Sequence, residues 1–198
     1  MPALLYIHGF LSSPNSFKAL QVKDWLQQYR PDIEYYCPFL TVYPDQVQTE
    51  LDRIVAGVKA QGEDLYLMGS SMGGFWCSYL VEKYDLPALL INPAVRPSML
   101  MPEYVGKTLK NYHSEDSYTL EAKHIEQLRA LLPEEITRPD NYWVLLQTED
   151  ETLDYRQAAQ LYQHCKLTIE EGGDHAFQGF ERFIEPGIEF LAQRYQKA

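Results

Sequence analysis

The chain has few cysteines, and their arrangement could not hold a small secreted fold together. Cys37, Cys77 and Cys165 are the three cysteines in 198 residues. Their odd number and wide separation exclude a disulfide framework and provide no paired spacing for metal ligands. We therefore expect three reduced, partly buried thiols.

Positive charge is also scarce. The sequence contains 17 lysine and arginine residues against 28 aspartate and glutamate residues, which gives a formal net charge of −11. Such a charge repels the phosphates of nucleic acids and the surfaces of anionic membranes. Neither is expected as a partner.

Long apolar runs are missing. No run approaches the roughly 18 residues that a membrane-spanning helix needs. The opening run Ala3–Ile7 is too short for the core of a signal peptide, and no basic segment precedes it. We expect a cytoplasmic protein, folded as a single domain that buries about 70% of the surface of its unfolded chain.

Short apolar runs alternate with helix-length amphipathic stretches along the chain. This alternation is typical of a three-layer α/β fold, in which helices cover both faces of a mostly parallel sheet. The predicted strands are Ala3–Ile7, Ile33–Cys37, Leu65–Met68, Ala88–Ile91, Tyr142–Gln147 and Leu167–Ile169.

Helix signals lie between these runs. Ser13 followed by Pro14 predicts a cap and a first helical residue, with Leu20, Val22, Trp25 and Leu26 facing the sheet. The predicted helices run from Pro14 to Tyr29, Pro44 to Ala60, Met72 to Tyr84, Tyr155 to His164, and Phe177 to Tyr195.

Residues 97–140 interrupt the alternation. They contain no clear strand but a helix-like pattern at Leu120, Ile125, Leu128 and Leu131. We interpret the segment as a small helical insertion over the carboxyl ends of the strands, where open parallel sheets bind ligands, with residues 107–118 as a mobile flap. An ordinary crossover of two short helices is the alternative.

The segment from Gly69 to Gly73 has the pattern of a nucleophile elbow. It follows an apolar strand and opens a helix, and Ser71 lies at its centre. Gly69 and Gly73 remove the β-carbons that would collide in so sharp a turn. Choosing Ser70 instead would put Met68 and Met72 at the crowded positions, so Ser71 is the candidate nucleophile.

A serine nucleophile needs a histidine base. His175 follows the last predicted strand, after a loop with the Gly172-Gly173 pair, and precedes the final helix. A loop at this edge can carry an imidazole to the elbow. His175 is therefore the candidate base, and a capping or packing role is the alternative.

The carboxylate that orients this histidine should follow the serine and precede the histidine in the chain. Asp150 lies three residues beyond the end of the strand that finishes at Gln147. Glu149 and Asp154 are the rivals, although Asp154 is also suited to cap the following helix.

Acyl transfer also needs donors for the oxyanion. The amide of Met72, at the start of a helix, is one candidate, and the amide of Phe10, after Gly9 in the first loop, is the second. His8 is expected to hold that loop through a hydrogen bond, with a role as base as the alternative.

These blocks resemble the α/β-hydrolase superfamily, and within it the UPF0227 (YqiA/YcfP) family of small bacterial esterases. The matching blocks are Tyr6–Pro14, Gly69–Gly74, Leu90–Ala94, Gln147–Tyr155 and Gly172–Phe177. The resemblance implies six parallel strands in the order 2-1-3-4-5-6, without the first two strands of larger hydrolases. It also implies a serine esterase that cleaves short to medium acyl esters without a metal or organic cofactor.

The chain departs from related hydrolases near the acid, where they often carry glycine and this sequence has Gln147-Thr148-Glu149. Aromatic and methionine residues suggest an acyl pocket formed by Phe10, Trp76, Met99 and Tyr118.

Two other functions remain open, and a third is disfavoured. An acyl-CoA thioesterase would need a basic patch, which Arg96, Lys107 and Lys110 could supply. A catalytically silent binding protein would not need to retain the triad. A flavodoxin-like domain would need more glycines after the first strand than His8-Gly9-Phe10 offers.

Overall fold

The protein is built on a sheet of six parallel strands. The computed structural model describes residues 1–131 and 135–196. The sheet order β2-β1-β3-β4-β7-β8 is the predicted order 2-1-3-4-5-6. The strands are β1 (Ala3–Ile7), β2 (Glu34–Tyr36), β3 (Leu65–Ser70), β4 (Ala88–Ile91), β7 (Tyr142–Gln147) and β8 (Lys166–Glu170).

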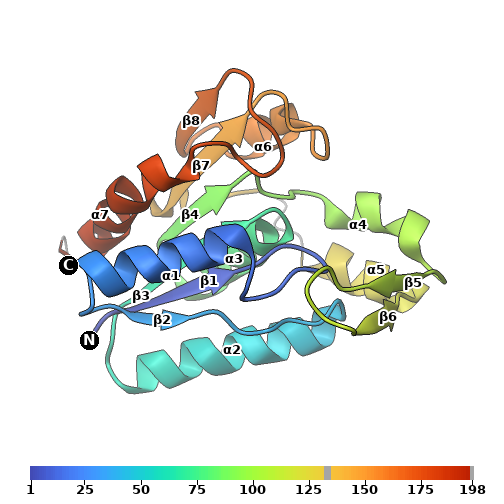
Figure 1. Cartoon of the computed structure of the whole chain (residues 1–198), viewed down its shortest axis with the longest axis horizontal. Helices are drawn as coiled ribbons and strands as arrows, with labels where there is room; N and C mark the ends of the chain where they lie inside the picture. Colours follow the sequence, from blue (N-terminus) through green and yellow to red (C-terminus); the bar gives the residue numbers. More distant parts are fainter. Residues whose placement is uncertain (132–134, 197–198) are drawn as a thin grey trace.

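Helices cover both faces of this sheet (Figure 1). Leu4 and Tyr6 of β1 share one core with α1 (Phe17–Tyr29) and α7 (Ile184–Gln196). Leu5 and Ile7 share the other with α2, α3 and α6. Those helices span Pro44–Ala60, Met72–Tyr84 and Tyr155–Leu161. Because neighbouring strand residues point to opposite faces, a strand covered on both sides must be apolar throughout. The three-layer architecture predicted from the alternating runs is therefore confirmed.

The start of α1 differs from the prediction. Ser16, not Ser13, precedes the first helical residue, because the hydroxyl oxygen of Ser13 accepts a hydrogen bond from the Asn15 amide and forms a turn instead. The buried stripe is Ala19, Val22 and Leu26. Leu20 is 39% exposed, so its expected place against the sheet was wrong, whereas Trp25 is partly buried and packs against the core on that face.

The final helix also begins later than predicted. Phe177 has a φ of 61° and Gly179 has a φ of 71°, so the chain turns there before a 3-10 helix, η3 (Phe180–Phe183), leads into α7 at Ile184. In the described part of the chain, no helix combines the length and the apolar character required to cross a membrane.

The insertion contains strands that the sequence pattern did not reveal. Leu109 and Tyr118 are the buried residues of two three-residue strands, β5 and β6, too short to show a period. The elements are α4 (Pro97–Leu100), η1 (Met101–Tyr104), β5 (Thr108–Lys110), β6 (Ser117–Thr119), α5 (Ala122–Ala130) and η2 (Pro139–Asn141). The insertion is therefore helical in part, as expected, and also contains a hairpin that was not expected. Residues 132–134 of that segment lie outside the described residues.

The β5–β6 hairpin is attached to the loop that follows β1. The Tyr112 amide donates to the Leu11 carbonyl at 2.9 Å, and the Asn111 side chain donates to the Ser12 carbonyl at 3.0 Å. In Figure 1 the hairpin and α4 lie beyond the carboxyl ends of the strands. Movement of this segment as a flap stays a prediction.

Candidate active site

The turn between β3 and α3 forces Ser71 into a rare backbone conformation. Its φ of 57° and ψ of −121° lie in a region that costs a residue other than glycine about 1–3 kcal/mol. The turn passes close to its neighbours: a β-carbon on Gly73 would lie 1.9 Å from the Ile7 carbonyl oxygen. The Ser71 amide donates to the Ile91 carbonyl at 3.0 Å, and its own carbonyl accepts from Ala94 at 2.9 Å. These bonds hold the strained residue between β3 and β4.

Three side chains from distant parts of the sequence meet at this turn. The Ser71 hydroxyl lies 3.0 Å from Nε2 of His175. Nδ1 of His175 lies 2.9 and 2.8 Å from the two carboxylate oxygens of Asp150. This is the geometry of a nucleophile, a base and an orienting acid.

The surroundings of Asp150 separate it from its rivals in the sequence. Its side chain is 2% exposed, and its Oδ1 accepts from the amides of Thr152 and Leu153 at 2.9 and 2.8 Å. These amides orient the carboxylate toward the imidazole. Asp154 instead accepts from the Arg156 amide and caps α6, as expected, and Glu149 lies exposed in the loop.

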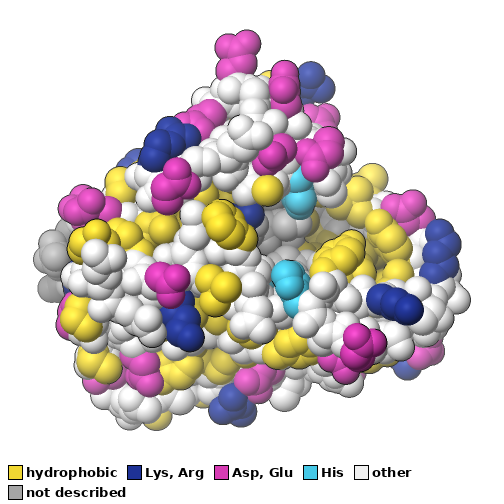
Figure 2. Space-filling model, in the orientation of Figure 1, with side chains coloured by type: hydrophobic (Ala, Val, Ile, Leu, Met, Phe, Trp, Pro, Cys, Tyr) yellow, Lys and Arg dark blue, Asp and Glu magenta, His cyan; other side chains and the backbone are white. Residues whose placement is uncertain are grey.

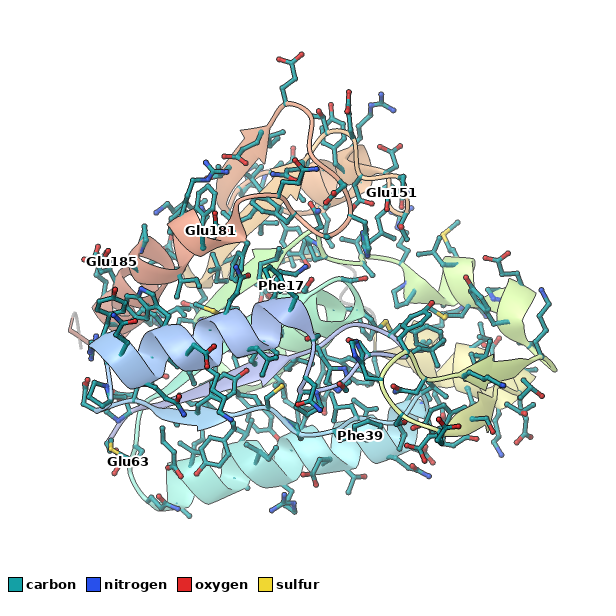
Figure 3. All side chains as sticks on the ribbon, viewed as in Figure 1. Phe17, Phe39, Glu63, Glu151, Glu181 and Glu185 are labelled. Atoms are coloured by element: carbon teal, nitrogen blue, oxygen red, sulfur yellow. The ribbon has the colours of Figure 1, made fainter. Side chains whose placement is uncertain are left out.

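A residue that the sequence analysis missed holds the backbone of the histidine. Oε2 of Glu151 accepts from the His175 amide at 2.9 Å. Glu151 lies in the loop between β7 and α6 (Figure 3). The sequence offered only one signal for this contact, namely that Glu151 follows Asp150 directly. That signal is weak, because the chain is rich in glutamates.

The two amides expected to bind the oxyanion belong to Met72 and Phe10. Met72 is the first residue of α3, so its amide has no acceptor within the helix, and Phe10 follows the turn at Gly9. Neither amide donates a backbone hydrogen bond within residues 1–131 and 135–196. Both residues border the cleft described below.

His8 is bound to the backbone at both ring nitrogens. Nδ1 donates to the Gly9 carbonyl at 2.9 Å, and Nε2 accepts from the Leu40 amide at 3.2 Å. Burial lowers the pKa of His8, because the charged imidazole would lose its hydration. His8 therefore braces the first loop as a neutral group, as the sequence analysis expected, and is not turned toward Ser71.

A cleft of about 520 Å³ opens above Ser71 and His175. Its apolar lining includes Phe10, Phe17, Leu100, Met101, Tyr104, Tyr112 and Leu153. Figure 2 shows this face hollowed between the part carrying β8 and α6, at the top, and the part carrying α4 and β5, at the right, where hydrophobic side chains gather. The cleft is therefore suited to an apolar group attached to the reacting carbonyl.

The pocket residues predicted beside Phe10 lie elsewhere. Met99 is 70% exposed, Trp76 is buried in the core, and Tyr118 is buried edge-on against Tyr43. None of the three lines the cleft. Composition could not separate Met99 from its neighbours Leu100 and Met101, which do line it, because only the turn of α4 decides which side chains face inward.

The basic residues considered for a nucleotide are also outside the cleft lining. Arg96, Lys107 and Lys110 are exposed, and the one cation among the cleft residues is Lys18. Lys18 donates to the Ala176 carbonyl, and burial lowers the pKa of its ammonium group. Within residues 1–131 and 135–196, no cluster of basic side chains lines the cleft, so the thioesterase alternative gains no support there.

The strand order and the helices on both faces of the sheet are those of the α/β-hydrolase fold. The chain belongs to the Uncharacterised protein family (UPF0227), whose model matches residues 3–192.

Solved structures agree with this fold. Est1E from Butyrivibrio proteoclasticus, solved with bound ferulic acid, is 16% identical with a TM-score of 0.73, over 99% of this chain and 90% of that one. A monoacylglycerol lipase from Paleococcus ferrophilus is 14% identical with a TM-score of 0.69, over 95% and 94%. Alpha/beta hydrolase domain-containing protein 10 from mouse is 16% identical with a TM-score of 0.68, over 100% and 90%. At these identities the likeness concerns the fold.

Proposed function

We propose that the protein is a serine esterase that hydrolyses short to medium acyl esters through an acyl-enzyme. One observation carries this proposal: the continuous contact from Ser71 Oγ to His175 Nε2, at 3.0 Å, and from His175 Nδ1 to the Asp150 carboxylate, at 2.8 Å. A serine hydroxyl is a weak nucleophile at neutral pH, and this alignment is the one that activates it.

In the proposed first step, Nε2 of His175 takes the hydroxyl proton as Ser71 attacks the acyl carbonyl carbon. The carbonyl oxygen becomes negative, and the Phe10 and Met72 amides stabilise it, each contributing about 10²–10³ in rate. The imidazolium then protonates the leaving alcohol as the carbon–oxygen bond breaks. Asp150 keeps the imidazole in the required tautomer and stabilises its charged form.

The second half repeats this chemistry with water. His175 removes a proton from the water as it attacks the acyl-enzyme, and then returns a proton to Ser71 as the carboxylic acid leaves. The proposed reaction needs only side chains, backbone amides and water.

The cleft supports an ester with an apolar acyl group. Its aromatic and aliphatic lining lies beside the serine, and its volume of about 520 Å³ leaves room for a short or medium chain. Two of the similar structures are named for an esterase with ferulic acid and for a monoacylglycerol lipase. Ester cleavage by those proteins is consistent with the proposal.

A fluorophosphonate probe tests the proposal directly, because it reacts only with an activated serine. We expect stoichiometric labelling of the folded protein at Ser71, no labelling of Ser71→Ala, and slow labelling of His175→Ala. Hydrolysis of p-nitrophenyl butyrate should follow the same pattern. Folded protein that takes up no probe and cleaves none of a panel of p-nitrophenyl esters would show that the proposal is wrong.

A further inference from the structure

Two buried carboxamides lie where two loops approach each other: the loop after β7, which carries Asp150, and the loop after β8, which carries His175. Asn92 follows β4 and is 2% exposed, and Gln147 ends β7 and is 3% exposed. A buried amide destabilises a protein unless its donors and acceptors are satisfied. The partners of these two side chains therefore indicate what they do.

Asn92 joins three segments of the site. Its Oδ1 accepts from the backbone amide of Gln147 at 3.0 Å. Its Nδ2 donates to the backbone carbonyls of Asp174 and His175 at 3.0 and 3.3 Å. Its φ of 39° is positive, a conformation that asparagine tolerates better than most residues. The neighbouring Ile91 carbonyl accepts from the Ser71 amide. Asn92 thus contacts both the loop that carries His175 and the end of β7, and it lies next to a residue bonded to Ser71.

Gln147 binds the same loop along its other edge. Its Oε1 accepts from the amides of Asp174 and Gln178 at 3.2 and 2.8 Å. Its Nε2 donates to the Gln178 carbonyl at 2.9 Å and to a carboxylate oxygen of Glu170 at 3.0 Å. Both donors and the acceptor of this side chain are satisfied. Because Gln147 also lies three residues before Asp150, it ties the position of the base to that of the acid.

The glycine pair before His175 makes room for this side chain. A β-carbon on Gly173 would lie 1.9 Å from Oε1 of Gln147. Gly172 has nearly the same φ, 82° against 80°, but nothing lies within 4 Å of the place where its β-carbon would be. The two glycines therefore serve the loop differently: both permit the turn, and only Gly173 also makes room for Gln147.

We propose that Asn92 and Gln147 are positioning residues that set the His175 imidazole between Asp150 and Ser71 by holding the backbone of residues 174–178. This proposal rests on the proposed esterase function. A misplacement of about 1 Å between reacting groups costs about 100-fold in rate, so small shifts of this loop are measurable.

The two glycines provide a matched experiment. Gly172→Ala and Gly173→Ala each place a methyl group on a residue with a φ near 80°, but only Gly173→Ala displaces Gln147. We expect Gly173→Ala to lower kcat for p-nitrophenyl butyrate about 10- to 100-fold with KM changed less than about threefold. Gly172→Ala should retain kcat within about threefold of the wild type. Equal kcat values in the two variants would overturn the role of Gln147.

Asn92→Asp tests the second residue. The aspartate keeps the oxygen that accepts from Gln147, but it replaces the amide that donates to the Asp174 and His175 carbonyls with a second acceptor. We expect kcat to fall at least about tenfold, while titration of active serines by a fluorophosphonate still reaches one per molecule at a slower rate. An unchanged labelling rate would contradict the role of Asn92. A lower labelling endpoint at matched thermal stability would contradict it as well, because a positioning residue should slow every active site rather than inactivate some of them.

A spectroscopic measurement separates this proposal from the esterase proposal. The Nδ1 proton of His175, shared with Asp150, should give a downfield proton NMR signal in the wild type and in Gly172→Ala. We expect this signal to be lost or shifted in Gly173→Ala and Asn92→Asp. If the wild type lacks esterase activity but the signal follows this pattern, only the proposed function fails. If all four proteins give the same signal, the positioning role fails whatever the activity.

Discussion

The nucleophile elbow and the histidine loop hold their residues in opposite ways. Ser71 lies on a tight turn that Gly69 and Gly73 make possible, and backbone hydrogen bonds to Ile91 and Ala94 hold it there. His175 is held from a distance, by Asn92, Gln147 and Glu151 on other segments. A motif of five residues marks the first arrangement in the sequence, whereas no local motif marks the second.

The largest expected effect tests whether the two regions act as one unit. Ser71→Ala and His175→Ala should each lower kcat for p-nitrophenyl butyrate by at least about 10⁴-fold, because either change removes the activated nucleophile. The double variant should be no more than about threefold worse than the poorer single variant. Losses that multiply in the double variant would mean that the two side chains work independently. Circular dichroism controls for folding.

The next effect breaks the elbow alone. Gly73→Ala should lower the free energy of unfolding by about 1–3 kcal/mol, because its β-carbon would meet the Ile7 carbonyl at 1.9 Å and the strand must shift. Gly57→Ala is the matched control: this exposed glycine in α2 has nothing within 4 Å of its β-carbon position. It should raise stability by up to about 1 kcal/mol. Urea unfolding measures both, and an unaltered midpoint for Gly73→Ala would refute the close approach.

A third effect sharpens the comparison by showing that neither region selects the acyl group. Leu100→Ala and Tyr112→Ala each remove an apolar side chain of the insertion that lines the cleft. We expect kcat/KM for p-nitrophenyl hexanoate to fall about 3- to 10-fold and that for the acetate to change little. Met99→Ala, outside the cleft lining, is the control. Equal losses on both esters would place the acyl group elsewhere.

The smallest effect concerns His8, which braces the loop beside the elbow. Because burial lowers its pKa in the folded protein, the unfolded chain binds a proton more readily as the pH falls below about 6.5. His8 should therefore reduce stability as the pH falls from 7.5 to 5.5, with a slope of at most about 1.4 kcal/mol per pH unit. Urea unfolding of the wild type and His8→Gln at both pH values isolates this contribution. A wild type that loses no more stability than the variant would contradict it.

The fold was predictable because each of its signals is short-range. Alternating apolar runs predicted the six strands, the resemblance to α/β-hydrolases supplied their order, and the final helix was misplaced only at its start, where Phe177 takes a positive φ. The β5–β6 hairpin was missed because its strands span three residues each, with one buried residue apiece. So brief a pattern carries no period that sequence reasoning can detect.

The candidate site divides in the same way. Ser71, His175 and Asp150 were identifiable because each follows a strand at one edge of a parallel sheet, and that edge gathers its loops. Trp76, Met99 and Tyr118 were chosen by residue type and do not line the cleft. Residue type states that a side chain is apolar but not which way its short helix turns.

By itself the sequence determined the chemistry that is available: a serine between glycines, a histidine and an acid after later strands, and enough apolar runs to cover a sheet twice. The tertiary structure alone decided which acid meets the imidazole, that Asn92 and Gln147 bridge the loops, and which side chains line the cleft. The physical reason is range. Backbone sterics act between neighbours in the chain, whereas buried hydrogen bonds and packing depend on segments that come together only on folding.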